Sequence, residues 1–124
     1  MENKLGNTIF TGLKSVIYPS ANLDADKKFW ESVTGVKPYF DKPYYVGFSI
    51  NGCELGLDPN AAKEGLNFPV AYWHVKDTVE AAKQMIAGGA TVNTEAKDVG
   101  GGMMMATFKD QSGNIFGIID DPNA

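Results

Sequence analysis

Two side chains in this sequence have the chemistry of a general acid or base. Glu54 follows the Asn51-Gly52 dipeptide at the start of a predicted strand, and His74, the only histidine, ends another. A carboxylate in an apolar setting can have a raised pKa and act as a base, but Glu54 can equally be an exposed residue near a hairpin. His74 is either a lone acid–base group or a partly solvated residue that pairs with a neighbour. These two are the catalytic candidates.

A thiolate nucleophile finds no support in the sequence. Cys53 is the only cysteine, and no histidine or cationic residue stands near it in sequence to lower its pKa. A single cysteine also excludes an intrachain disulfide and any cysteine-rich zinc site. Together with an N-terminus that has no long apolar run, it indicates a reducing, cytoplasmic setting.

Length and charge narrow the class of partner. With 124 residues and 44% hydrophobic content, the chain suits one domain with a real core. The net charge is −4 and all eleven basic residues are lysine, which argues against nucleic acid, an anionic membrane surface and phosphorylated ligands. No apolar run approaches the roughly 20 residues that span a bilayer, so no membrane segment is expected.

The elements that must position these side chains begin with a strand at 70–75 that leads into a helix. Asp77 is the expected N-cap, Glu80 completes a capping-box pattern, and the helix should start near Thr78. Gly88-Gly89 is expected to supply the left-handed conformation that ends it. Its apolar face is predicted to contain Val79, Ala82, Met85 and Ile86.

The same order of strand, cap, helix and glycine occurs roughly 55 residues earlier. There Asn22 is the expected cap and Gly35 the stop, and the apolar stripe is Phe29, Trp30 and Val33. Each copy is followed by three extended segments. We therefore expect one domain made of a first half at about 13–58, a linker at 59–67 and a second half at about 68–120.

Turn residues delimit the remaining strands. Asn51-Gly52 favours a type I′ hairpin between strands at 44–50 and 53–57, preceded by a strand at 37–40. The last three strands are expected at 90–95, 103–109 and 115–119. Residues 1–12 are either a short edge strand or a tail.

A β-α-β-β-β unit that occurs twice and ends in Asp110-Gln-Ser-Gly-Asn114 resembles the vicinal-oxygen-chelate superfamily, which includes glyoxalase I, extradiol dioxygenases and bleomycin-resistance proteins. Segments 16–19, 43–48, 54–57, 69–73 and 99–102 are similar to a glyoxalase-like branch of it. The resemblance implies an α+β fold in which the strands form a curved, cup-like mixed sheet with the helices on its outer face.

The resemblance also implies where a metal would bind. Members that are enzymes hold it with four side chains, and the corresponding positions are Ser15, then Glu54 or Gly56, then Val70, then Gly117. Three of these four cannot supply a histidine, carboxylate or thiolate donor. We therefore expect the cup without the metal, and no cofactor.

By the same resemblance, the ligand is a small apolar or aromatic molecule held in the cup between the halves. Strand alternation favours Tyr45 over Tyr44 for the cup side, and puts Tyr72 and His74 there too. Which of Met103, Met104 and Met105 face the cup stays open. The predicted ligand-binding residues are Ser15, Ile17, Pro19, Tyr45, Glu54, Val70, Tyr72, His74 and Gly117.

Two other functions remain open at this point. One is a lyase or isomerase in which Glu54 or His74 moves a proton without a metal. The other is a dimerising module whose strand edges and aromatic residues serve subunit contacts. A homodimer is expected in either case, as paired cups are frequent in the superfamily.

Overall fold

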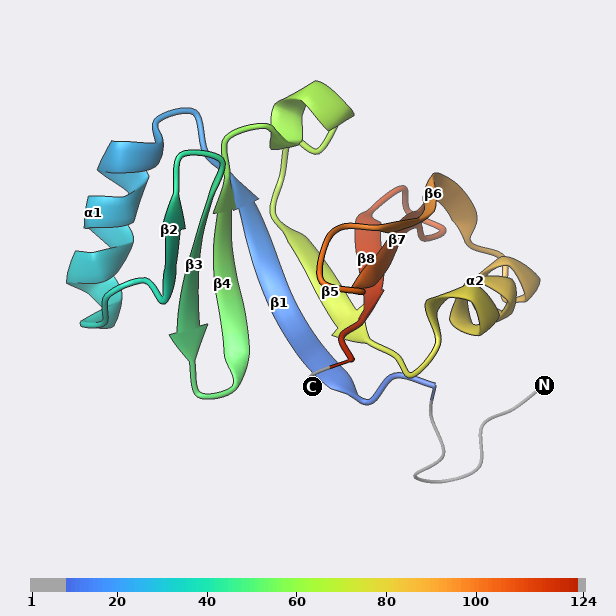
Figure 1. Ribbon diagram of the computed structural model, residues 1–124. Coiled ribbons are helices and arrows are strands. Elements are labelled where there is room, and N and C mark those ends of the chain that lie inside the picture. The colour runs from blue at the N-terminus through green and yellow to red at the C-terminus, as the bar shows by residue number, and fades with distance from the viewer. Residues whose placement is uncertain (1–8, 123–124) are drawn as a thin grey trace. The chain divides into compact units, whose positions relative to one another are not determined.

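Two strand–helix units, each followed by three strands, make up the part of the chain that the computed structural model describes, residues 9–122. The first unit is Ser15–Ala71, and of the described residues the second contains 9–14 and 72–122. Each unit has four strands and one α-helix against them (Figure 1). The α+β class and the repeated β-α-β-β-β order are therefore as predicted.

The first unit is a mixed sheet in the order β2-β3-β4-β1. β1 runs parallel to β4, whereas the β2–β3 and β3–β4 pairs are antiparallel. A short 3₁₀ helix, Ala61–Glu64, follows the last strand within the predicted linker. The elements are β1 (Gly12–Pro19), α1 (Leu23–Thr34), β2 (Phe40–Lys42), β3 (Tyr45–Ile50) and β4 (Cys53–Asp58).

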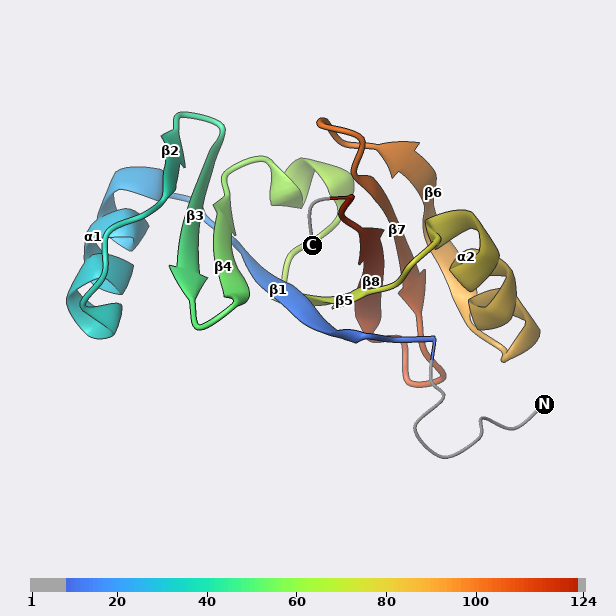
Figure 2. The same ribbon diagram turned by 60° about the horizontal axis from the view of Figure 1, so that its bottom comes forward.

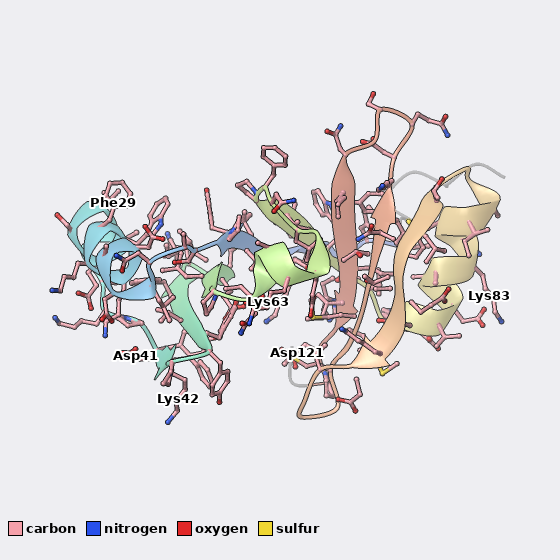
Figure 3. The ribbon with its side chains drawn as sticks, turned by 90° about the horizontal axis from the view of Figure 1, so that it is seen from above. Phe29, Asp41, Lys42, Lys63, Lys83 and Asp121 are labelled. Atoms are coloured by element: carbon pink, nitrogen blue, oxygen red, sulfur yellow. The ribbon has the colours of Figure 1, made fainter. Side chains whose placement is uncertain are left out.

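Helix α1 has the predicted caps but not the predicted inner face. The Asn22 side chain accepts the N–H of Ala25 at 3.1 Å, and Gly35 ends the helix at φ 77°. Trp30 packs against the core, but Phe29 and Val33 are 55% and 60% exposed. Figure 3 shows the Phe29 side chain on α1. The stripe prediction was right for Trp30 and wrong for Phe29 and Val33, and none of the helix residues is fully buried.

The predicted hairpin is confirmed, but the strand that precedes it lies later in the chain than predicted. Asn51 and Gly52 both have positive φ, 48° and 88°, as a type I′ turn requires. β2 lies at Phe40–Lys42 rather than at 37–40, and the chain turns at residues 43 and 44. Pro38 has no N–H to donate to the ladder, so backbone pairing starts with the Tyr39 N–H on the Gly47 oxygen at 2.9 Å.

The second unit repeats the arrangement in the order β5-β8-β7-β6 (Figure 2). β5 is parallel to β8, and the β8–β7 and β7–β6 pairs are antiparallel. Of the stretch 1–12, residues 1–8 lie outside the described residues, and the Thr11 N–H donates to the His74 oxygen at 2.8 Å. The elements are β5 (Val70–His74), α2 (Thr78–Ala87), β6 (Thr91–Asp98), β7 (Met104–Lys109) and β8 (Ile115–Asp120).

Helix α2 begins at Thr78, as predicted. Asp77 accepts the N–H of Glu80 at 3.1 Å. At the other end, Gly88 stays right-handed at φ −81° and only Gly89 takes a positive φ of 104°. The prediction of a left-handed helix end was therefore right for Gly89 and wrong for Gly88.

The buried side of α2 is set by Thr78 rather than by the predicted stripe. The Thr78 N–H donates to Asp120 at 2.9 Å and its hydroxyl donates to the Met104 carbonyl at 3.1 Å. This anchor turns Ala81, with Ala82 and Met85, toward the sheet. The two predicted positions Val79 and Ile86 are instead 51% and 53% exposed.

Each unit has its own core between its helix and one face of its sheet. The first core is Val46, Phe48 and Leu57, and the second is Val75, Ala81, Ala106, Phe108 and Ile118. We call the other face of each sheet, turned away from its helix, the far face. No helix within residues 9–122 is long and apolar enough to cross a membrane.

Candidate functional site

Strand alternation decides which side chains of the first unit reach its far face. Val46 and Phe48 of β3 lie in the core, so Tyr45 and Gly47 point the other way. Leu57 of β4 is also in the core, which turns Glu54 and Gly56 to the far face. Residues directly opposite in register share a face, and Gly47 is opposite Gly56.

β1 completes this face. Ser15 pairs with Glu54 and Ile17 with Gly56, so both lie on the far face, and Pro19 follows by alternation. The Ser15 side chain is only 2% exposed. The sequence-predicted residues of the first half thus come together on one surface, and their role in binding stays a prediction.

Glu54 is the polar centre of this surface. The Tyr39 hydroxyl donates a short hydrogen bond to the Glu54 carboxylate, and Tyr45 is a second hydrogen-bond partner of the same group. Burial, followed by the negative charge of Glu54, raises the pKa of Tyr45 well above its ordinary value. The Tyr45 phenol therefore stays protonated as a donor over the whole physiological pH range.

Two buried glycines, Gly47 and Gly56, leave the space that the Glu54 and Tyr45 side chains occupy. A Cβ at Gly47 would lie 2.6 Å from Glu54 Oε2, and a Cβ at Gly56 would lie 1.9 Å from the Tyr45 hydroxyl oxygen. Glu54 and Tyr45 thus rest directly on the backbone of the neighbouring strand. Glycine inside a strand commonly marks such a close approach.

The two tyrosines that interact with Glu54 pack against the Phe40 ring of β2. The Phe40 ring centroid lies 6.5 Å from that of Tyr39, 6.1 Å from that of Tyr45 and 6.0 Å from that of Tyr44. These separations suit tilted and edge-to-face aromatic pairs. We call Glu54 together with Tyr39, Phe40 and Tyr45 the Glu54 cluster.

On the far face of the second unit, a tyrosine ring also packs over a glycine. Tyr72 is opposite Gly117, and its ring carbons lie 2.2 and 2.3 Å from where a Gly117 Cβ would stand. Tyr72 is 3% exposed, and the position that corresponds to the family's fourth ligand is therefore covered by its ring. Val70, the third such position, is also 3% exposed.

A hydroxyl group is buried on the same sheet. Thr107, opposite Gly117, is 4% exposed, and its hydroxyl oxygen lies 2.6 Å from that of Thr94. Asn93 donates its side-chain amide to the same oxygen at 3.0 Å. The β6–β7 ladder shifts register on both sides of Thr94, which lets two successive β6 residues reach one partner. Sequence reasoning did not find this network.

His74 is held by hydrogen bonds at the end of β5. The Asp121 N–H donates to Nε2 at 3.4 Å, so Nδ1 carries the proton and donates to the Thr11 hydroxyl oxygen at 2.5 Å. That hydroxyl in turn donates to the His74 carbonyl at 3.3 Å. Both ring nitrogens thus have partners within the second unit, which favours the structural reading of this histidine.

A hollow of about 490 Å³ adjoins His74 but does not carry the candidate site. Its acidic side chains are already engaged: Asp77 caps α2, Asp120 accepts from Thr78, and Asp121 pairs with Lys14 at 3.3 Å. The Glu54 cluster lies in the other unit. We place the candidate site at the cluster because, among residues 9–122, its carboxylate has only neutral donors, whereas the acidic side chains of the hollow are engaged by the fold.

The donors for a metal are sparse. In the part of the chain that the structure describes, no group of three or more His, Cys, Asp or Glu side chains is arranged to hold an ion. Glu54 is the one carboxylate at the predicted ligand positions, and the Ser15 hydroxyl shares its face. A Zn²⁺ or Fe²⁺ site would need further histidine, carboxylate or thiolate donors.

The sequence reasoning missed Tyr39, Phe40 and Gly47 of the site, and it considered Gly56 only as an alternative ligand position. Tyr39 and Phe40 were assigned to a strand and given no role, because β2 was expected three residues too early. A signal for the glycines was present: Gly47 and Gly56 interrupt otherwise apolar strands and so point to something that lies on the backbone there.

A family model described as Glyoxalase/Bleomycin resistance protein/Dioxygenase superfamily matches residues 12–118. No curated protein matches the chain. Among solved structures, a variant of methylmalonyl-CoA epimerase from Streptomyces coelicolor superposes with a TM-score of 0.74 at 17% identity, covering 91% of this chain and 99% of that one.

Two further solved structures show the same fold. Methylmalonyl-CoA epimerase from Mycobacterium tuberculosis has a TM-score of 0.69 at 15% identity, with 94% and 92% of the chains covered. A glyoxalase/bleomycin resistance protein/dioxygenase superfamily member from Vibrio splendidus 12B01 has a TM-score of 0.65 at 16% identity, with 88% and 99% covered. At such identities the likeness concerns the fold alone.

Proposed function

Because the chain belongs to the Glyoxalase/Bleomycin resistance protein/Dioxygenase superfamily, we propose that it is a small-molecule-binding protein that works without a catalytic metal. The ligand is an apolar or aromatic molecule, and the Glu54 cluster is part of its site. The observation that carries this proposal is a carboxylate held by two phenols and flanked by aromatic rings on the far face.

The shape and chemistry of the cluster support an aromatic ligand. Tyr39 is 63% exposed although it hydrogen-bonds to Glu54, so a ligand in solution can reach the cluster at this residue. Sites for small molecules commonly combine aromatic walls with a few placed polar groups. Glu54 and the phenol groups would orient the ligand, while Phe40 and Tyr45 supply apolar contact.

Native mass spectrometry and amide NMR test the binding proposal. A retained molecule, or saturable shifts at the amides of Gly47 and Gly56 when aromatic compounds are added, is the expected result. Tyr39→Ala should weaken such binding by about 1 to 2 kcal/mol through lost ring contact. Shifts that never saturate, together with no retained molecule, would count against a binding function.

The proposal of metal independence rests on the residues at the predicted ligand positions. Ser15, Val70 and Gly117 offer no imidazole, carboxylate or thiolate. Elemental analysis after dialysis is expected to find less than one equivalent of any transition metal. One bound Zn, Ni, Fe or Mn per chain, with thermal stability lost on chelation, would contradict it.

A second candidate function is proton transfer by Glu54 in a lyase or isomerase. Glu54 accepts from Tyr39 and Tyr45, so one carboxylate and two phenol donors meet at one point of the surface. A carboxylate can remove a proton next to a carbonyl while a phenol donates to the developing oxyanion. Turnover of an α-keto or hemithioacetal substrate that Glu54→Gln abolishes would favour this function.

Two further expectations belong to the same proposal. We infer a homodimer, supported by the exposed apolar side chains Phe29, Val33 and Val36 at α1, and light scattering would contradict it by giving the 13.4 kDa of one chain. A dimer that binds no small molecule would instead favour the dimerising module.

We also infer a cytoplasmic location from the single cysteine, which cell fractionation tests.

A further inference from the structure

We propose that the ligand of the Glu54 cluster is an organic cation, an aromatic or alkyl compound with an ammonium group. This inference rests on the proposed binding function and specifies the ligand class. The argument has three steps: the charge of Glu54 is not neutralised by the protein, aromatic rings lie beside it, and the chain as a whole attracts cations.

Glu54 has only neutral donors. Across residues 9–122 the ion pairs join Lys14 to Asp121, Lys27 to Asp41 and Lys83 to Glu80, so none of them uses Glu54. A carboxylate has about four lone-pair positions, and two phenols occupy two of them. The negative charge and the remaining positions are left for a donor from outside the protein.

Lys42 is the lysine closest to the cluster in the ladder, and it leaves Glu54 unpaired. It lies opposite Tyr45 in the β2–β3 register but is exposed. Figure 3 shows its side chain extending outward from β2. The cluster is thus not a closed internal salt bridge.

The aromatic rings add a second attraction for the same charge. The faces of Tyr and Phe rings carry negative potential and attract ammonium groups within about 6 Å of the ring centroid. The Phe40 ring centroid lies 6.5 Å from that of Tyr39 and 6.1 Å from that of Tyr45, and both tyrosines interact with the Glu54 carboxylate. Aromatic side chains around one acidic group are the usual means of recognising methylated or alkylated amines.

The overall charge acts in the same direction. The chain has net charge −4 and no arginine, so an anionic ligand would meet an unfavourable field and no bidentate partner. A neutral ligand could use the rings, but it would leave the Glu54 charge uncompensated. A cation satisfies both parts of the cluster.

Three probes of similar size and different charge test the inference: benzylammonium, benzyl alcohol and benzoate. Titrations at low ionic strength are followed by NMR at the amides of Gly47 and Gly56. The cation should bind on the order of tenfold more tightly than the alcohol, with benzoate weakest. Added salt should reduce that advantage, because exposed charges are screened.

Variants assign the effect to the cluster. Glu54→Gln should weaken the cation on the order of tenfold and change the affinity for the alcohol much less, whereas the matched control Glu64→Gln, which removes the same charge from an exposed residue of the 3₁₀ helix, should change neither affinity. Tyr39→Leu should weaken the cation several-fold, and Tyr39→Phe should retain most of its affinity. The amide spectrum shows whether each variant is folded.

The possible failures are distinguishable. Saturable binding of benzyl alcohol as tight as that of the cation, or an unchanged cation affinity in folded Glu54→Gln, would overturn the cation inference and leave the proposed binding function standing. If none of the three probes gives saturable shifts at Gly47 and Gly56, both the inference and the binding function at this site are wrong.

Discussion

The Tyr45 hydroxyl oxygen lies 1.9 Å from the position that a Cβ of Gly56 would occupy. The two residues are on the adjacent strands β3 and β4, and the tyrosine side chain packs over the glycine backbone. A methyl group at position 56 cannot coexist with this rotamer, and the burial of Tyr45 and its hydrogen bond to Glu54 depend on the rotamer.

Gly56→Ala should therefore destabilise the fold and displace Tyr45. Overpacking at a buried site costs about 1 to 3 kcal/mol, and we expect the upper part of that range in urea unfolding. Gly88→Ala is the matched control, because Gly88 is right-handed and its added Cβ would meet only ordinary contacts from 3.4 Å. Equal costs for the two variants would contradict the proposed packing.

Tyr45 should make the fold sensitive to alkaline pH. Its pKa is raised in the folded state above the ordinary value near 10, so its contribution is complete below pH about 10 and is lost as pH rises beyond that value. The slope is at most about 1.4 kcal/mol per pH unit for one proton. Tyr45→Phe should remove this part of the alkaline dependence.

Stability of the wild type and of Tyr45→Phe between pH 8 and 11 measures the effect. Tyr44→Phe is the control, because Tyr44 is 59% exposed and its removal should leave the alkaline slope as it is. An ultraviolet titration gives an independent reading, in which Tyr45 should be the last tyrosine to ionise. If Tyr45→Phe and Tyr44→Phe have the same slope, Tyr45 is not buried beside Glu54.

The order of elements could be read from the sequence because local signals determine it. Asn22 and Asp77 cap their helices, Asn51-Gly52 forms the predicted turn, and Gly35 ends α1. Each depends on a few neighbouring residues. Alternation likewise put Tyr45 and Glu54 on one side of their strands, because the side-chain period of two admits few alternatives once one face is apolar.

The inner faces of the helices and the make-up of the cluster could not be predicted in this way. Both sides of α2 carry apolar residues, and the choice is made by hydrogen bonds from Thr78 to residues 26 and 42 positions later. Tyr39 meets Glu54 across 15 residues, from a position just before β2, whose start Pro38 displaces. Such long-range contacts leave no periodic trace in the sequence.

Thr107→Val should destabilise the second unit although the two side chains have nearly the same shape. The buried hydroxyl has two side-chain partners, Thr94 and Asn93, and its loss removes one hydrogen bond from each, although Thr94 still accepts the Thr107 N–H at 3.2 Å. We expect a cost of about 1 to 3 kcal/mol in urea unfolding. With Thr94→Val and the double variant, these measurements form a double-mutant cycle, and we expect a coupling free energy between the two hydroxyl groups of at least about 0.5 kcal/mol. Strict additivity would mean that the hydroxyls do not interact.

The last prediction concerns the Tyr72 ring and the glycine beneath it. Tyr72→Ala should cost about 3 to 5 kcal/mol, because it removes a buried aromatic and leaves a cavity, whereas Tyr72→Phe keeps the ring and should cost about 1 kcal/mol. Gly117→Ala alone should also destabilise, since its Cβ would lie 2.2 Å from the ring. In the double variant the new methyl group enters the space that the ring has left. The double variant should therefore be more stable than the sum of the single changes implies, and two independent costs in urea unfolding would contradict the contact.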